Sequence, residues 1–196
     1  YKDLAKILDT EDKISAYEIN ISCPNISEDG KAFGMFPNKT YDIVNEIKKV
    51  SKKTIIVKLT PNVSDITQIA KAAVSAGADA LTVANTYIGM AVDIDTKRPV
   101  LGNIIGGLSG AAIKPLTLRL VYDVKKSVNV PVIASGGVYT ARDALEYIMV
   151  GASAVEVGTA NFSKPDVMID IITGIKKFME EKNIEDINDF IGSMND

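Results

Sequence analysis

Five short apolar segments alternate with helical patterns along this chain, and no other feature restricts its fold as strongly. The segments are rich in β-branched residues and lie at 17–22, 54–59, 80–84, 131–135 and 154–158. Helical patterns predict helices at 39–51, 65–76, 113–127, 141–150 and 164–182. Short apolar strands that alternate with helices are typical of a parallel sheet covered by helices, so an α/β protein is predicted.

A repeated phrase marks two of the turns from helix to strand. Ala-Gly-Ala-Asp-Ala at 76–80 and Val-Gly-Ala-Ser-Ala at 150–154 each place a glycine at a helix end, directly before the next strand. Such repetition is typical of a (β/α)8 TIM barrel, which has eight strands and about 250 residues. Because residues 1–10 read as the tail of a preceding helix, we expect 1–196 to be the C-terminal five βα units of a TIM barrel, strands 4–8. The other three units would then precede residue 1.

The composition excludes several classes of function. A net charge of −3 and a pI near 5.1 give no basic face for nucleic acid. The absence of histidine removes the Ser-His-Asp triad and most zinc sites, so no metal centre is expected. One cysteine allows neither an internal disulfide nor an ordinary iron–sulfur cluster. Proton transfer must then fall to Cys, Lys, Tyr or carboxyl groups.

The sequence shows no targeting or membrane signal. The first residues lack a signal-peptide pattern, and no apolar run approaches the length of a membrane span. A cytoplasmic protein without membrane contact is therefore expected.

One connection, at 85–112, is unusually long and shows few helical or strand signals. It is rich in glycine and small polar residues, including Gly-Gly-Leu-Ser-Gly at 106–110. Loops of this length inside a compact domain are usually functional or disordered, and glycine allows the backbone to approach a ligand closely.

The octapeptide at 18–25 holds the only cysteine, Cys23, just past the first apolar segment. A cysteine alone is more often a small buried apolar residue than a catalyst, but a loop position before Pro24 weakens that explanation. Asn20 lies within the strand-like run, where a side-chain amide needs hydrogen-bond partners. Asn25 closes the motif. A thiol in such a loop can act as a base or nucleophile, and the two amides can hold a polar ligand.

Two further strands carry polar residues at or just past their ends. Lys58 lies in a segment expected to be buried, so it either has a partner or function there, or extends outward along the strand end. An anionic or electron-rich cofactor in the barrel mouth would favour the first alternative. Asn85 and Thr86 follow the third segment, where asparagine most often caps a turn.

Glycines follow the last two strands. Gly136-Gly137 comes directly after the fourth segment and Gly158-Thr159 ends or follows the fifth. These would be the loops after barrel strands 7 and 8, which frequently bind phosphate through backbone N–H groups and a helix N-terminus. Either motif alone is more often a plain turn, but two in consecutive loops favour a phosphate site.

Taken together, these motifs resemble the dihydroorotate dehydrogenase family, flavin enzymes of pyrimidine synthesis. The resemblance covers nearly the whole chain, in the family's order. The matching stretches are Asn-Ile-Ser-Cys-Pro-Asn (20–25), Val-Lys-Leu-Thr-Pro-Asn (57–62), Ala-Asn-Thr (84–86), Gly-Gly-Leu-Ser-Gly-Ala-Ala-Ile-Lys-Pro (106–115), Ser-Gly-Gly-Val (135–138) and Val-Gly-Thr-Ala (157–160). A cysteine rather than a serine in the first motif resembles class 1 enzymes, and Gly-Gly-Leu-Ser-Gly is similar to the class 1B branch.

The resemblance implies roles for the matching residues. Cys23 would take a proton from C5 of dihydroorotate while hydride leaves C6 for FMN, and orotate would result. The pyrimidine would be held by Asn20, Asn25, Asn85 and Thr86. FMN would be held by Asn20, Lys58, Ala84, Gly110, Gly136, Gly137, Gly158 and Thr159, with Lys58 against the flavin ring.

The resemblance also implies partners and leaves alternatives open. A class 1B enzyme would be a homodimer joined by an electron-transfer subunit that carries FAD and an iron–sulfur cluster, a heterotetramer that passes electrons to NAD. The family's N-terminal third, with further flavin and substrate contacts, is not matched. A barrel like the pyrimidine-reducing domain of dihydropyrimidine dehydrogenase is one alternative. A non-catalytic barrel remnant that only binds partners is the other.

Overall fold

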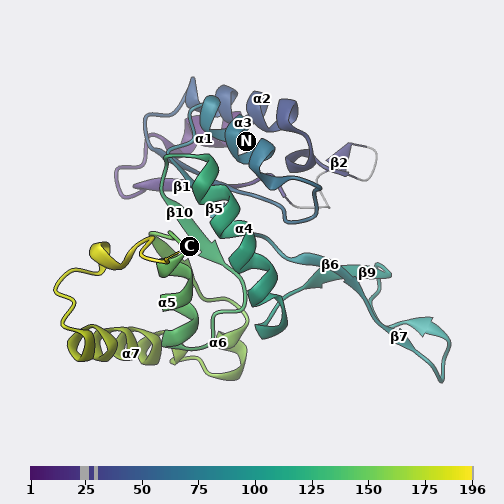
Figure 1. Cartoon of the computed structure of the whole chain (residues 1–196). Coiled ribbons are helices and arrows are strands. Elements are labelled where there is room, and N and C mark those ends of the chain that lie inside the picture. Colours follow the sequence, from purple (N-terminus) through teal and green to yellow (C-terminus); the bar gives the residue numbers. More distant parts are fainter. Residues whose placement is uncertain (23–26, 29–30, 196) are drawn as a thin grey trace.

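The centre of the molecule is a parallel five-stranded sheet (Figure 1). The structure, a computed structural model, describes residues 1–22, 27–28 and 31–195. In the order β1-β4-β5-β10-β11, the strands of this sheet are Ala16–Asn20, Thr54–Lys58, Ala80–Val83, Val132–Ser135 and Ala154–Glu156. All five predicted strands are confirmed, and each lies next to the one that precedes it among them, as in a barrel wall.

Helices connect the successive strands of this sheet. The α-helices are α1 Lys2–Leu8, α2 Pro37–Lys48, α3 Ile66–Ser75, α4 Lys114–Ser127, α5 Ala141–Met149, α6 Ala160–Ser163 and α7 Val167–Lys182. Short 3-10 turns are η1 Phe33–Met35, η2 Ala111–Ile113 and η3 Ile187–Phe190. No helix among the described residues has both the length and the apolar character that crossing a membrane requires.

The last predicted helix, 164–182, begins later than expected. Lys164 has an extended backbone (φ −146°, ψ 99°) and ends the short helix α6, which the sequence did not predict. The cause is Pro165, because the ring of a proline disfavours helical backbone in the residue before it. The main helix α7 therefore starts only at Val167.

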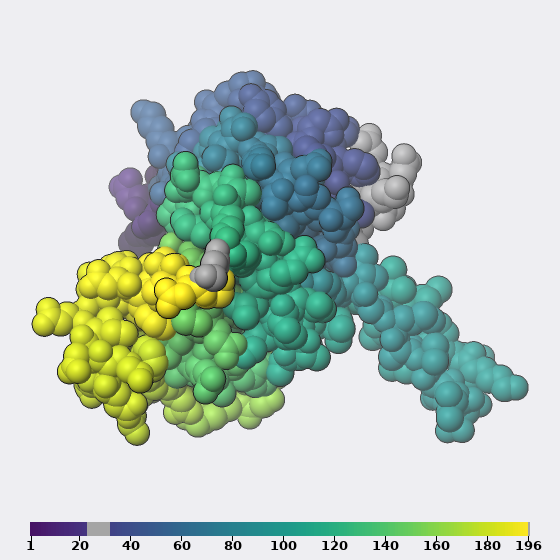
Figure 2. Space-filling model, viewed as in Figure 1, coloured from purple at the N-terminus to yellow at the C-terminus, as the bar shows by residue number. Residues whose placement is uncertain are grey.

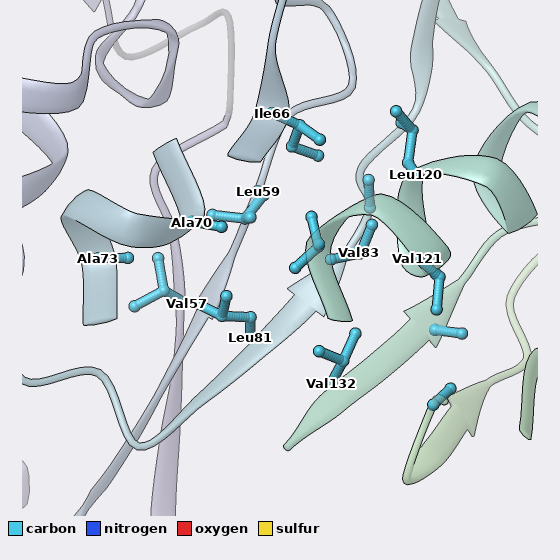
Figure 3. Packing of buried hydrophobic residues seen from close by; sticks show 14 of the residues in the cluster. Val57, Leu59, Ile66, Ala70, Ala73, Leu81, Val83, Leu120, Val121 and Val132 are labelled. Atoms are coloured by element: carbon cyan, nitrogen blue, oxygen red, sulfur yellow. The ribbon is translucent and has the colours of Figure 1, made fainter. Parts of the chain in front are cut away.

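One face of the sheet forms the core with the helices (Figure 3). Val57, Leu81 and Val132 are fully buried, and α3 and α4 cover them with Ala73 and Val121 among other side chains. Side chains alternate between the two faces of a strand, so the neighbours of these residues lie on the opposite face.

That opposite face is polar. In the register of the sheet, Lys58 pairs with Asn20 on one side and with Thr82 on the other, so the three lie in one row. On β1, Ile19 is buried whereas Glu18 and Asn20 are exposed. The row faces the interior of the expected barrel and lies at the carboxyl ends of β1, β4 and β5.

The long connection at 85–112, which shows few strand signals in the sequence, contains four short strands. β6 (Tyr87–Met90) pairs antiparallel with β9 (Ile105–Leu108), and β7 (Val92–Asp93) pairs with β8 (Arg98–Pro99). Together they form an arm that projects from the body of the molecule (Figures 1 and 2). A smaller hairpin pairs β2 (Ser27–Glu28) with β3 (Lys31–Ala32).

Candidate active site

A cavity of about 280 Å³ opens at the carboxyl ends of the central strands. It gathers most of the residues predicted to bind a cofactor. Its predicted lining residues are Lys58, Ala84, Asn85, Thr86, Gly110, Gly136, Gly137, Gly158 and Thr159. Lining residues to which the sequence assigned no role are Ser109, Ile113, Ser135, Val138, Tyr139 and Phe162. Asn20 is not among the lining residues of this cavity.

Glycine is required where two loops of this cavity meet. Gly137 has φ +70°, and a Cβ there would lie 2.9 Å from the carbonyl oxygen of Gly110 and 3.0 Å from the backbone nitrogen of Lys114. Gly110 itself has φ +102°. Both positions therefore need glycine, which lets the segment before α4 and the loop after β10 touch through their backbones.

The loop after β11 completes this wall. Thr159 donates a hydrogen bond from its Oγ1 to Ser109 Oγ at 2.8 Å. A Cβ on Gly158 would meet no atom within 4 Å, so the backbone there borders open space. The wall thus consists of three glycine-containing segments, which is the surface that a phosphate needs to approach backbone N–H groups.

The loop after β10 is held from behind by α5. Tyr147, fully buried, donates a hydrogen bond to the carbonyl oxygen of Gly136 at 2.6 Å. Burial is the main cause that raises the pKa of the Tyr147 hydroxyl, so it remains a donor. Thr140 and Asp143 form a capping box at the start of α5. These contacts fix the loop before any ligand binds.

Lys58 has two carboxylate partners on the polar face of the sheet. Its Nζ lies 2.8 Å from Glu156 Oε2 on β11 and 3.2 Å from Glu18 Oε1 on β1. Only 19% of the Lys58 side chain is exposed. Burial works to lower the pKa of this ammonium, but the hydrogen bond and charge of Glu156 and the charge of Glu18 outweigh it, so the pKa is raised.

Of the two alternatives for Lys58, the structure therefore shows a partnered lysine inside the sheet face. Sequence reasoning missed Glu18 and Glu156. The available signal was the same as for Lys58, a charged residue within an otherwise apolar strand. Thr82 adds to this cluster by donating a hydrogen bond to Glu18 Oε2 at 2.6 Å.

A second polar cluster joins the ends of β1 and β5. Asn85 donates from Nδ2 to Ser22 Oγ at 2.6 Å and to Asn20 Oδ1 at 3.2 Å. Ser22 Oγ in turn donates to Asn20 Oδ1 at 2.7 Å. The backbone nitrogen of Thr86 donates to Asn85 Oδ1 at 2.8 Å. The structure thus brings Asn20, Asn85 and Thr86 together, whereas Cys23 and Asn25 lie outside the described residues.

A second cavity, of about 380 Å³, lies on the other side of Asn85 and Thr86. Its lining residues are Ser22, Ala32, Met35, Thr60, Asn62, Asn85, Thr86, Ile88, Asn103, Ile105, Gly106 and Gly107. Asn85 and Thr86 line both cavities, so they form the wall between them.

Within 1–22, 27–28 and 31–195, no three His, Cys, Asp or Glu side chains are grouped as metal ligands.

The sequence is similar to those of known proteins. Residues 1–179 match the family model described as dihydroorotate dehydrogenase. The catalytic subunit of dihydroorotate dehydrogenase B (NAD(+)) from Thermoanaerobacter sp. is 52% identical over 191 residues, which cover 97% of this chain and 63% of that protein. The subunit of the same name from Bacteroides thetaiotaomicron is 46% identical over 194 residues, 99% of this chain and 64% of its own length.

Solved structures show the same relation. Ligand-free dihydroorotate dehydrogenase from Eimeria tenella superposes with a TM-score of 0.80 at 26% identity and covers 98% of this chain but 59% of its own length. The same enzyme in complex with ferulenol gives a TM-score of 0.79 at 25% identity, over 98% of this chain and 57% of its own.

The prediction of a partial TIM barrel is therefore confirmed. The chain spans 63 to 64% of the length of its Thermoanaerobacter and Bacteroides relatives. On the family match over residues 1–179, and on relatives that align with nearly all of it, the chain belongs to the dihydroorotate dehydrogenase family.

Proposed function

We propose that this chain is the C-terminal five-unit part of an FMN-dependent dihydroorotate dehydrogenase of class 1B, which oxidises dihydroorotate to orotate in UMP biosynthesis. The observation that carries the proposal is one cavity that combines a three-loop glycine wall, a partly buried lysine and the Asn85-Thr86 wall. The names of the relatives, dihydroorotate dehydrogenase B (NAD(+)), support the substrate and the class.

The residues of the first cavity fit FMN. The glycines at 110, 136, 137 and 158, with Thr159, would hold the phosphate, because their backbones border open space or need the absence of a side chain. Lys58 would place a positive charge near the ring and stabilise negative charge there. FMN, when bound, supplies the acceptor for the hydride from C6 of the substrate.

The substrate would lie against the wall that the two cavities share. Asn20, Asn25, Asn85 and Thr86 would hydrogen-bond the pyrimidine, and amides suit its alternating carbonyl and N–H groups. Cys23 would accept the C5 proton. A thiol can do this at neutral pH only where its surroundings lower its pKa from about 8.5.

Electron transfer beyond FMN would require partners. We propose a homodimer of the catalytic subunit joined to an electron-transfer subunit with FAD and an iron–sulfur cluster. Two facts support this: the relatives are named catalytic subunits of an NAD(+) enzyme, and this chain has a single cysteine. A cluster held by cysteines needs several thiolates, and the single cysteine of this chain cannot supply them.

Flavin spectroscopy of the intact protein tests the proposal. Bound FMN is expected in the purified protein, with its absorbance bleached by anaerobic dihydroorotate. Dihydrouracil is the matched control, because it lacks the carboxylate. Faster bleaching by dihydrouracil would favour an enzyme like dihydropyrimidine dehydrogenase. A colourless protein that FMN cannot reconstitute would indicate a non-catalytic barrel and overturn the proposal.

A further inference from the structure

Thr86 occupies the space that the missing side chain of Gly107 leaves. A Cβ built on Gly107 would lie 2.3 Å from Thr86 Oγ1, 2.9 Å from its Cβ and 3.3 Å from its Cγ2. Real Cβ atoms do not approach other atoms so closely, and the nearest three atoms all belong to one side chain. Any residue other than glycine at 107 must therefore displace Thr86 or the strand that carries position 107.

Gly107 differs in this from another glycine of the same two-stranded ribbon. Gly89 on β6 would place a Cβ 3.4 Å from Leu108 Cβ, an ordinary contact. Neither glycine has a positive φ that would itself require glycine. The special constraint at 107 is thus the neighbouring Thr86 side chain and not the backbone conformation of the ribbon.

Asn62 prevents the segment around Thr86 from moving away. Its Nδ2 donates to the carbonyl oxygen of Thr86 at 3.0 Å, and its Oδ1 accepts from the backbone nitrogen of Ile88 at 3.0 Å. The Asn62 amide thus hydrogen-bonds the backbone of the residues before and after Tyr87, as the backbone of a neighbouring strand would. Thr60 holds Asn62 in turn, because its Oγ1 accepts hydrogen bonds at 3.2 Å from both nitrogens of Asn62.

The position of Thr86 matters because it separates two cavities. Gly106 and Gly107 line the cavity on one side, and Ser109 and Gly110 of the same segment line the cavity on the other. With its backbone held by Asn62, a displaced Thr86 side chain can only enter one of these spaces or push β9 outward. Both outcomes change the wall on which a pyrimidine ligand would lie.

We propose that Gly107 and Asn62 are positioning residues that fix Thr86 for pyrimidine binding. Because residue 107 has no side chain, Thr86 keeps its place in the Asn85-Thr86 wall between the two cavities. The inference rests on the proposed function, since it takes the ligand of that wall to be a pyrimidine carboxylate. The β6–β9 ribbon is thereby part of the site, although most of the arm projects away from it.

Orotate binding to the intact FMN-loaded protein tests this, measured as the dissociation constant from the change in flavin absorbance. Gly107→Ala is expected to weaken orotate binding about tenfold or more, the usual effect of forcing a side chain into an occupied space. Gly89→Ala, the matched control, is expected to stay within about twofold of wild type. Equal affinities for wild type and Gly107→Ala would overturn the inference.

The same substitution in a Thr86→Gly variant distinguishes a loss of Thr86 positioning from general damage to the arm. Thr86→Gly removes all three atoms that an alanine at 107 would meet. In that background, Gly107→Ala is expected to cost no more than about a further twofold, because the coupled partner is gone. A further tenfold loss there would contradict the role of Thr86. Should Gly107→Ala lose its flavin, regained flavin in the double variant supports the inference and continued loss contradicts it.

The proposed function and this inference fail in different ways. A wild-type protein without flavin, or without an orotate-dependent spectrum, would overturn the proposed function. A wild-type protein that binds both, with a Gly107→Ala variant that behaves like Gly89→Ala, would overturn the inference alone.

Discussion

Lys58 shows how one residue depends on groups far away in the sequence. Its partners Glu18 and Glu156 come from the first and last strands of the sheet. The sequence singled out Lys58, because a lysine inside an apolar strand is unusual. It could not pair the lysine with Glu156, because 98 positions separate them and only the curvature of the sheet brings them together.

Neutralising Glu156 should destabilise the protein. In Glu156→Gln the ammonium of Lys58 loses its nearer carboxylate, and we expect the free energy of unfolding to fall by about 1 kcal/mol, since both partners are partly exposed. Urea unfolding of the intact protein measures this. Glu181→Gln is the control, because its pair with Lys177 is 3.8 Å long and largely exposed. Equal losses in the two variants would show that the cluster adds nothing.

At the scale of elements, the central strands and the helices between them were predictable, whereas the arm and the short helix α6 were not. The pattern of apolar residues specified α3 and β4 within a residue or two, because each buries one face against the core. The strands of the arm have no such pattern. The apolar alternation of β6 and β9 is interrupted by Gly89, Gly106 and Gly107. β7 and β8 are only two residues long, so the pairing between them defines them and no periodic pattern does.

Asp143 at the start of α5 should make the free energy of unfolding fall as the pH becomes acidic. Burial works to raise the pKa of Asp143, but hydrogen bonds from Lys114, Thr140 and the backbone of the capping box outweigh it, so the pKa lies below 3.8. The unfolded chain then binds more protons, and this contribution is present above pH 3.8 and is lost as pH falls below it.

Replacing this carboxyl group should reduce the loss of stability at acidic pH. Asp143→Asn is expected to lower the free energy of unfolding at pH 7 by about 1 kcal/mol through the weakened cap, and to lose less stability than wild type between pH 5 and pH 3. Urea titrations at several pH values measure both effects. Parallel curves for the two proteins would show that Asp143 is not the titrating group.

The arm should contact a second copy of the chain in the proposed homodimer. Its large apolar side chains are exposed, among them Ile94 at 82%, Val100 at 61% and Met90 at 57%. Its tip also carries two acidic and two basic residues, at 93, 95, 97 and 98, a charge pattern that can complement itself about a two-fold axis. An apolar surface of this kind normally marks an interface.

A negative charge introduced in place of an apolar residue of the arm is therefore expected to weaken dimerisation. Ile94→Asp should raise the dimer dissociation constant at least about tenfold, since an aspartate would be desolvated at the interface. Ile169→Asp on α7 is the matched control, at a residue that is 64% exposed. Sedimentation equilibrium of the intact protein distinguishes them. An unchanged dimer with Ile94→Asp would exclude the arm tip from the interface.

At the scale of the whole molecule, the sheet is an incomplete barrel wall with two edges. β1 and β11 each have a neighbour on one side only, and the polar face at β1 leaves Glu18 and Asn20 exposed. Beside this edge, Tyr1, Leu4 and Leu8 line an apolar cavity with Ile19. In the enzyme proposed above, further strands of the barrel would cover these groups.

The 196-residue piece expressed alone should consequently associate with itself. Edge strands present unpaired N–H and C=O groups, which favour pairing with another chain, and the uncovered apolar cavity beside β1 adds to this tendency. Size-exclusion chromatography with light scattering over a range of concentrations measures it, with the intact protein as control. We also expect the piece to retain less FMN than the intact protein, because the polar face around Lys58 lies open on the side of β1. A monomeric piece that unfolds cooperatively and holds FMN as tightly as the intact protein would show that the five βα units form a complete site by themselves.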